Sequence, residues 1–123
     1  MPCLRISRRN LGVKVRDILK DALSTHATVY LSVISLGEIY YIIARKIGKE
    51  KADASLEDIS CLPISWIDAT KERVLAAAHV KAQHAVSYAD AFVVAAAVEH
   101  SATIVTGDPE FKETESLAAV LWL

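Results

Sequence analysis

One segment indicates the architecture of this chain most directly: SYADAFVVAAAVEHSATIVTGDPEF, residues 87–111. Its first part, Ser87–His100, has the small and apolar residues expected of a largely buried helix. The next part, Ala102–Thr106, is rich in β-branched residues and favours a strand. Asp108 followed by Pro109 then favours the start of a short helical turn. A helix, a strand and a turn in immediate succession are typical of a chain that alternates between the two kinds of structure.

The same alternation extends through the rest of the chain. Near-continuous apolar strands between helices indicate a parallel sheet that helices cover on both faces. We therefore predict an α/β fold with three layers, α/β/α, and a mostly parallel sheet in one domain, residues 1–123. The further elements expected are helices at 12–24, 35–47, 49–60 and 69–84, and strands at 28–33, 64–67 and 118–122.

The composition excludes several classes of protein. With 53% hydrophobic residues, four Gly and three Pro, the chain is neither disordered nor collagen-like. Its longest apolar stretch, Ala91–Val98, is far shorter than the roughly 20 residues of a membrane span. The first residues, Met1–Ile6, have no apolar signal core, so we expect a protein of the cytoplasm without a membrane partner. Cys3 and Cys61 form no metal-binding pattern.

Charge is unevenly distributed along the chain. Residues 1–20 carry six Lys and Arg against one Asp, a balance of +5. The other 103 residues carry eight basic and 14 acidic groups, a balance of −6. A basic arm beside an acidic site is an arrangement that a nucleic-acid enzyme could use to hold phosphates, and a solvated helix face is the simpler explanation.

Three acidic residues, Glu38, Asp90 and Asp108, lie near predicted helix starts. Each has a local explanation, since Ser35-x-x-Glu38 and Ser87-x-x-Asp90 fit capping boxes and Asp108 before Pro109 fits an N-cap. However, all three starts are expected at the carboxyl end of a parallel sheet, where ligands of α/β folds bind. Carboxylates that meet there repel one another unless a divalent cation or protons neutralise them. The pattern therefore predicts a magnesium-type site.

Two segments, SVISLGEIYYIIARKIG (Ser32–Gly48) and Ser87–Phe111, followed by the closing VLWL, resemble the PIN-domain ribonucleases. The resemblance is strongest to the VapC-like toxins of prokaryotic toxin–antitoxin pairs. It implies an endoribonuclease that binds Mg²⁺ or Mn²⁺, hydrolyses single-stranded RNA and has an antitoxin as partner. The matching residues are the acids Glu38, Asp90 and Asp108 and the hydroxyl residue Thr106, which could orient a ligand water.

The chain departs from this family at its beginning. Family members normally start with a central strand that ends in an Asp, and residues 1–11, MPCLRISRRNL, contain neither feature. The first strand and first acid are thus expected to be missing or replaced. The absent strand would lie between 28–33 and 102–106, and the alternating residues 2–7 suit a central strand poorly. Unpaired strand edges favour self-association, so we predict a symmetric homodimer.

Two other functions remain open at this point. An inactive PIN-like module could serve binding or oligomerisation, in which case Mg²⁺ or Mn²⁺ would not affect its melting. A phosphoacceptor receiver domain is also a parallel α/β fold with clustered acids, although only Asp68 follows a middle strand here. Arg45, seven residues beyond Glu38, could pair with that carboxylate or contact RNA.

Overall fold

The computed structural model describes Asp21 and residues 24–123, which fall into two compact units. One unit includes Leu36–Trp66 and the described residues up to Leu31. The other contains Ser32–Ser35 and Ile67–Leu123. The predicted helix at 12–24 and the basic arm at 1–20 lie largely outside the described residues, as do residues 2–7. That residues 1–123 form one domain stays a prediction.

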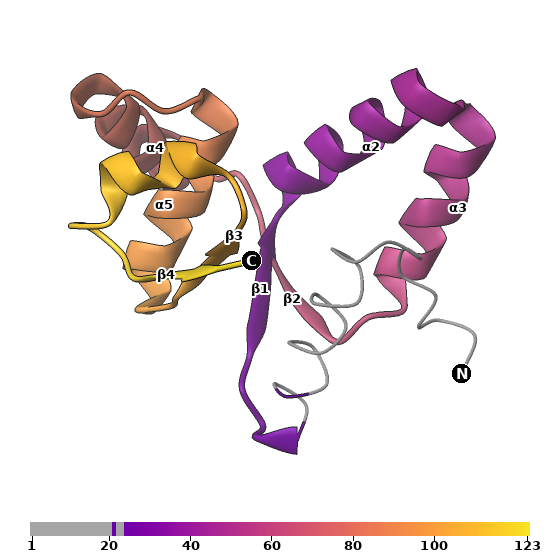
Figure 1. The fold of residues 1–123 in the computed structure, drawn as a ribbon, viewed down its shortest axis with the longest axis horizontal. Coiled ribbons are helices and arrows are strands. Elements are labelled where there is room, and N and C mark those ends of the chain that lie inside the picture. Colours follow the sequence, from indigo (N-terminus) through magenta and orange to yellow (C-terminus); the bar gives the residue numbers. More distant parts are fainter. Residues whose placement is uncertain (1–20, 22–23) are drawn as a thin grey trace. The chain divides into compact units, whose positions relative to one another are not determined.

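The first unit is built around a strand pair and a helical hairpin (Figure 1). Strand β1, Val29–Ser32, pairs with β2, Ile64–Ile67. Helix α2, Val33–Ile47, leads directly into α3, Lys49–Ser60. Gly48 makes this sharp connection because its φ of +99° is strained for any residue with a side chain.

Helix α2 begins two residues earlier than the sequence predicted. Ser32 lies directly before it, and its hydroxyl accepts the N–H of Ile34 at 3.1 Å, as an N-cap does. Ser35 is therefore inside the helix, and the capping box predicted for Ser35 and Glu38 is wrong. Glu38 lies beyond the first turn, where no backbone N–H needs a cap. Helix capping therefore does not explain the presence of Glu38 at this position.

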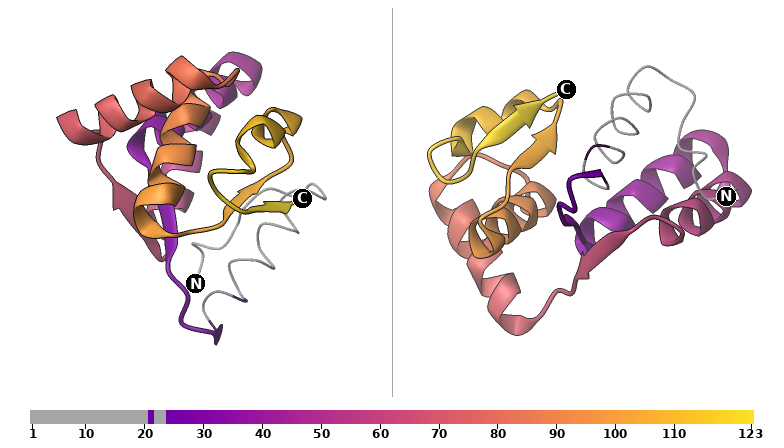
Figure 2. Two further views of the ribbon diagram at one scale, coloured as in Figure 1. Left: turned by 90° about the vertical axis from the view of Figure 1, so that its left-hand side faces the viewer. Right: turned by 90° about the horizontal axis from the view of Figure 1, so that it is seen from below.

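The second unit contains residues 87–111, the helix–strand–turn segment of the sequence analysis. Helix α4, Lys71–Gln83, packs against α5, Tyr88–His100, and α5 leads to β3, Ile104–Thr106. A 3₁₀ helix, η2, Pro109–Thr114, then returns the chain to β4, Val120–Trp122. Figure 2 shows β4 running alongside β3. The two strands are parallel, with Ile104 opposite Val120 and Thr106 opposite Trp122. The predicted α/β class with parallel strands is confirmed.

A single apolar cluster holds this unit together. Phe92 and Val94 of α5 and Phe111 of η2 are almost completely buried in it. Ala77 on α4 and Ala91 on α5 have no exposed area, because small residues allow the two helices to approach closely. Burial of Phe111 in the same cluster as Ala91, Phe92 and Val94 ties the turn that follows β3 to the core that α5 supplies. The other members of the cluster are Val80, Val86, Ala97, Ile104 and Ala118.

The described strands form two separate two-stranded sheets, β1–β2 and β3–β4. The division falls where the sequence predicted a missing central strand, between β1 and β3. Within the described part of the chain, these two strands do not pair with each other. That another segment or a partner chain fills the position stays a prediction. No helix among the described residues is long and apolar enough to cross a bilayer.

Candidate active site at the start of α5

Asp90 lies in the first turn of α5, where the sequence placed it. Ser87 is the N-cap, and its side chain accepts the N–H of Asp90 at 3.1 Å. In a complete capping box the Asp90 carboxylate would in turn accept the N–H of Ser87. That N–H instead donates to Oε1 of Glu110, 23 residues further along the chain. The carboxylate of Asp90 is therefore not used as the reciprocal cap.

Glu110 is the functional candidate that the sequence analysis missed. It lies in η2, and its carboxylate accepts the N–H of Ser87, three residues before Asp90. The signal available in the sequence was a second acid two residues after Asp108, in a turn that begins at the expected end of the sheet. Nothing local links this acid to Ser87, because the contact depends on η2 packing against α5.

The peptide group between Val86 and Ser87 is held from both sides by opposite charges. Lys81 of α4 donates from Nζ to the carbonyl oxygen of Val86 at 2.8 Å. The N–H of the same peptide donates to the Glu110 carboxylate. Hydrogen bonds to charged groups are the stronger kind, so this arrangement fixes the residue from which α5 begins. Fixing the start of α5 also positions Asp90, which lies three residues after Ser87 in its first turn.

The acidic cluster formed by Asp90, Asp108 and Glu110 has an excess of negative charge. Burial, the hydrogen bond with Glu110, and the charges of Glu110 and Asp108 raise the pKa of Asp90 to about 6, whereas a hydrogen bond from Ser87 lowers it. The N–H of Ser87, the contact with Asp90 and the charge of Lys81 keep the pKa of Glu110 below its ordinary value. Asp90 is thus expected to take up a proton before Glu110 as the pH falls.

Asp108 and Thr106 form the third part of the site, just after β3. The Asp108 side chain accepts the N–H of Glu110 at 2.9 Å and caps η2, with Pro109 at the first helical position. The N-cap predicted for Asp108 is therefore confirmed. The hydroxyl of Thr106 accepts the N–H of Asp108 at 3.0 Å and orients this capping residue. A role of Thr106 in orienting a water stays a prediction.

Glu38 lies on α2, in the other unit. Its convergence with Asp90 and Asp108 therefore stays a prediction. Over Asp21 and residues 24–123, no three His, Cys, Asp or Glu side chains are close enough together to hold a metal ion. The ligand chemistry nevertheless suits a hard cation, since the cluster offers carboxylate oxygens and an excess of negative charge.

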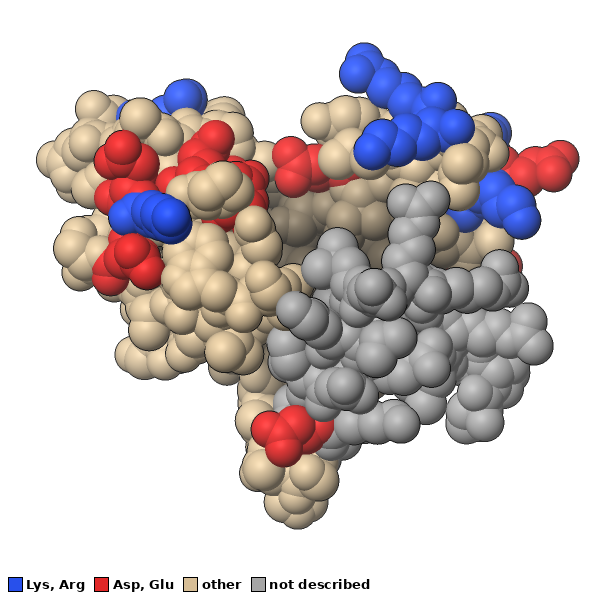
Figure 3. All heavy atoms as spheres, viewed as in Figure 1, with Lys and Arg blue, Asp and Glu red and all other residues tan. Residues whose placement is uncertain are grey.

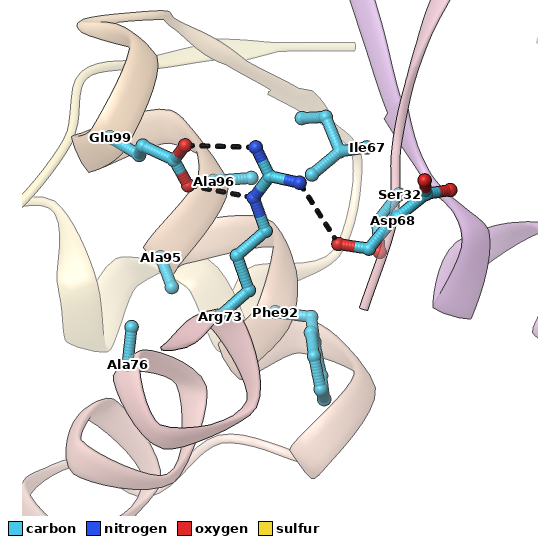
Figure 4. A pocket seen from close by; sticks show the side chains of 9 residues that line it. All are labelled: Ser32, Ile67, Asp68, Arg73, Ala76, Phe92, Ala95, Ala96 and Glu99. Carbon is cyan, nitrogen blue, oxygen red and sulfur yellow. Dashed lines mark hydrogen bonds and ion pairs between the residues drawn. The ribbon is translucent and has the colours of Figure 1, made fainter. Parts of the chain in front are cut away.

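A pocket elsewhere in this unit is lined by Arg73, whose hydrogen bonds connect neighbouring elements (Figure 4). The guanidinium of Arg73 on α4 donates to both carboxylate oxygens of Glu99 on α5, at 3.1 and 3.0 Å. A third donor reaches the carbonyl oxygen of Asp68 at 3.2 Å. Arg73 thus ties α4 to α5 and to the residue after β2. Its donors are engaged by protein groups, and the rest of the lining is mainly Ala, Ile and Phe, so we assign no ligand to this pocket.

The raised pKa of Asp90 predicts how stability changes with pH. A carboxyl whose pKa is about 6 when folded and 3.8 when unfolded favours the folded state less as pH rises from about 4 to 6. Asp90→Asn removes this charge and can still donate to Glu110. We expect the variant to be more stable than the wild type by about 1 kcal/mol above pH 6, after allowance for solvent screening, and to have no such advantage near pH 4. Urea unfolding at both pH values measures the difference, and a constant difference would contradict the assignment.

Comparison with known proteins identifies the family. A family model described as the PIN domain matches residues 4–117. The chain belongs to the PIN-domain family. The receiver-domain alternative is therefore abandoned, and the resemblance seen in the sequence is confirmed. A search of curated proteins gave no significant match.

Solved structures of the same fold include two VapBC assemblies. One is the crystal structure of VapBC2 from Rickettsia felis bound to a DNA fragment from their promoter, with 20% identity and a TM-score of 0.69. That match covers 91% of this chain and 87% of the other. The second is the crystal structure of DNA-bound VapBC from Salmonella typhimurium, with 18% identity, a TM-score of 0.66, and 87% and 82% of the two chains covered. These likenesses show a shared fold.

Proposed function

We propose that this PIN domain is a metal-dependent endoribonuclease of the VapC-like toxin kind that hydrolyses phosphodiester bonds of single-stranded RNA. The observation that carries the proposal is the placement of η2 at the start of α5, where Glu110 accepts the N–H of Ser87 and the charges of Glu110 and Asp108 act on Asp90. PIN domains are generally nucleases, and the family match supports the same conclusion.

Asp90, Glu110 and Asp108, together with Glu38 from α2, would hold Mg²⁺ or Mn²⁺. When bound, such a cation polarises the scissile phosphate and lowers the pKa of an attacking water. The contribution of the protein is to position these carboxylates: Ser87 and Lys81 fix the start of α5, and Thr106 orients Asp108. Thr106 would in addition orient a ligand water.

The proposal extends to partners. An antitoxin is proposed because both similar structures are VapBC assemblies. A homodimer is proposed because the strands that the structure describes form two separate two-stranded sheets, and unpaired strand edges favour association. The cytoplasm is the proposed location.

The direct test is cleavage of labelled single-stranded RNA by the purified chain. We expect cleavage with Mg²⁺ or Mn²⁺, none with EDTA, and a rise in Tm of a few degrees when Mn²⁺ is added, because a ligand that binds the folded state stabilises it. Ca²⁺ serves as the control cation, since its larger radius and irregular coordination suit catalysis less well. Cleavage that persists in EDTA would refute the metal mechanism. Absence of both cleavage and any Mn²⁺ effect on Tm would favour the inactive-module alternative.

A further inference from the structure

The turn between α2 and α3 carries an exposed concentration of positive charge. Of the eight Lys and Arg beyond residue 20, four lie within seven residues. All four are exposed, and Figure 3 shows basic side chains gathered over this end of α2 and α3. We call this group the basic corner; it consists of Arg45, Lys46, Lys49 and Lys51.

Two of the four cations are held in place by neighbouring side chains. Lys49 pairs with the Asp53 carboxylate at 2.6 Å, and the hydroxyl of Tyr40 donates to the same carboxylate at 2.8 Å. These bonds fix α2 against α3. Arg45 lies over the ring of Tyr41, with 5.5 Å between its guanidinium carbon and the ring centroid. The described residues contain no ion pair between Arg45 and Glu38, so the first of the two roles considered for Arg45 is not observed.

Lys46 and Lys51 have no ion-pair partner among the residues that the structure describes. Beside them, Tyr41 is 48% and Ile47 65% exposed. Cations interleaved with an exposed aromatic ring are the combination that single-stranded nucleic acids bind, since phosphates contact the cations and bases stack on the ring.

The basic corner lies on the same helix as a proposed catalytic acid. Arg45 is seven residues beyond Glu38 on α2, which at 1.5 Å per residue is about 10 Å along the axis. That is about three nucleotides of a stacked strand at 3.4 Å each. Because one helix carries both, their spacing does not depend on how the two units are arranged.

We propose that the basic corner binds the phosphate backbone of single-stranded RNA, about three nucleotides from the scissile bond. The inference rests on the proposed nuclease function for its choice of RNA. It assigns substrate binding to α2 and α3, in addition to the contribution expected from residues 1–20. Lys46 and Lys51 supply charge to the phosphates, and Arg45 with Tyr41 offers a stacking surface.

Binding can be tested without cleavage. Anisotropy of a fluorescein-labelled single-stranded RNA is measured in EDTA between 50 and 200 mM salt, with wild type, Lys46→Gln, Lys51→Gln and the double variant. Each lost phosphate contact is expected to reduce the slope of log K against log salt by about 0.7, and the double variant by about 1.4. Its affinity at 100 mM salt should fall about tenfold or more. Lys71→Gln, an equal charge change in the other unit, is the control and should change the slope by less than about 0.2.

The outcomes separate this inference from the nuclease proposal. A slope that falls for the corner variants and not for Lys71→Gln supports the basic corner even if the wild type cleaves nothing. Unchanged slopes in a chain that does cleave RNA would overturn the inference alone, and an acidic protein segment would then be the better partner for this patch. Equal losses in corner and control variants would also overturn it, since they would reflect net charge only.

Discussion

Asp90→Asn is expected to lower the rate of metal-dependent RNA cleavage by about a hundredfold or more, since even residues that only support metal ligands cost 10- to 100-fold when changed. The variant keeps the size of the side chain and the backbone N–H that bonds to Ser87. It removes the negative charge that the proposed cation would bind. Initial rates on a labelled single-stranded RNA at saturating Mn²⁺ provide the measurement.

Glu113→Gln is the matched control for this experiment. Glu113 lies in η2, three residues after Glu110, and is exposed. Its substitution removes one negative charge, as Asp90→Asn does, from the turn that contains Glu110, and should leave the rate within about twofold, because exposed charges interact weakly through water. A rate for Asp90→Asn above a tenth of the wild type would show that Asp90 is not a catalytic metal ligand. Urea unfolding of Asp90→Asn at neutral pH is expected to show a gain in stability, and that result would exclude unfolding as the cause of lost activity.

Phe92→Ala is expected to cost about 3–5 kcal/mol of unfolding free energy. The ring is 7% exposed, belongs to the apolar cluster and lies 5.3 Å from the ring of Tyr88. Its removal leaves a cavity between α5 and its neighbours. Since a domain of this size has a total stability of about 5–15 kcal/mol, the loss should be visible as a large decrease in the urea midpoint.

Val98→Ala on the same helix is the control for that measurement. Val98 is 53% exposed, so its truncation should change stability by less than about 0.5 kcal/mol. Comparable losses for the two variants would mean that α5 does not bury Phe92 as the structure places it.

Much of this fold could be predicted because the signals were local. The bounds of α3 and β2 and the caps at Ser87 and Asp108 agree with the sequence, since each depends on residues within two to four positions of one another. The start of α2 was predicted wrongly because two local signals compete there. Val33 has a high strand propensity, and the hydroxyl of Ser32 overrides it by capping the helix.

In the candidate site, too, some features could be predicted from local sequence and one depended on the fold. Residue patterns alone were sufficient to place Asp90 at a helix start, Asp108 at the next turn and Thr106 two residues before it. The hydrogen bond from Ser87 to Glu110 could be seen only in the folded chain. It forms because the apolar cluster buries Phe111, which brings the neighbouring Glu110 against the start of α5. No periodicity within either segment encodes a bond across 23 residues, since that bond depends on how two elements pack.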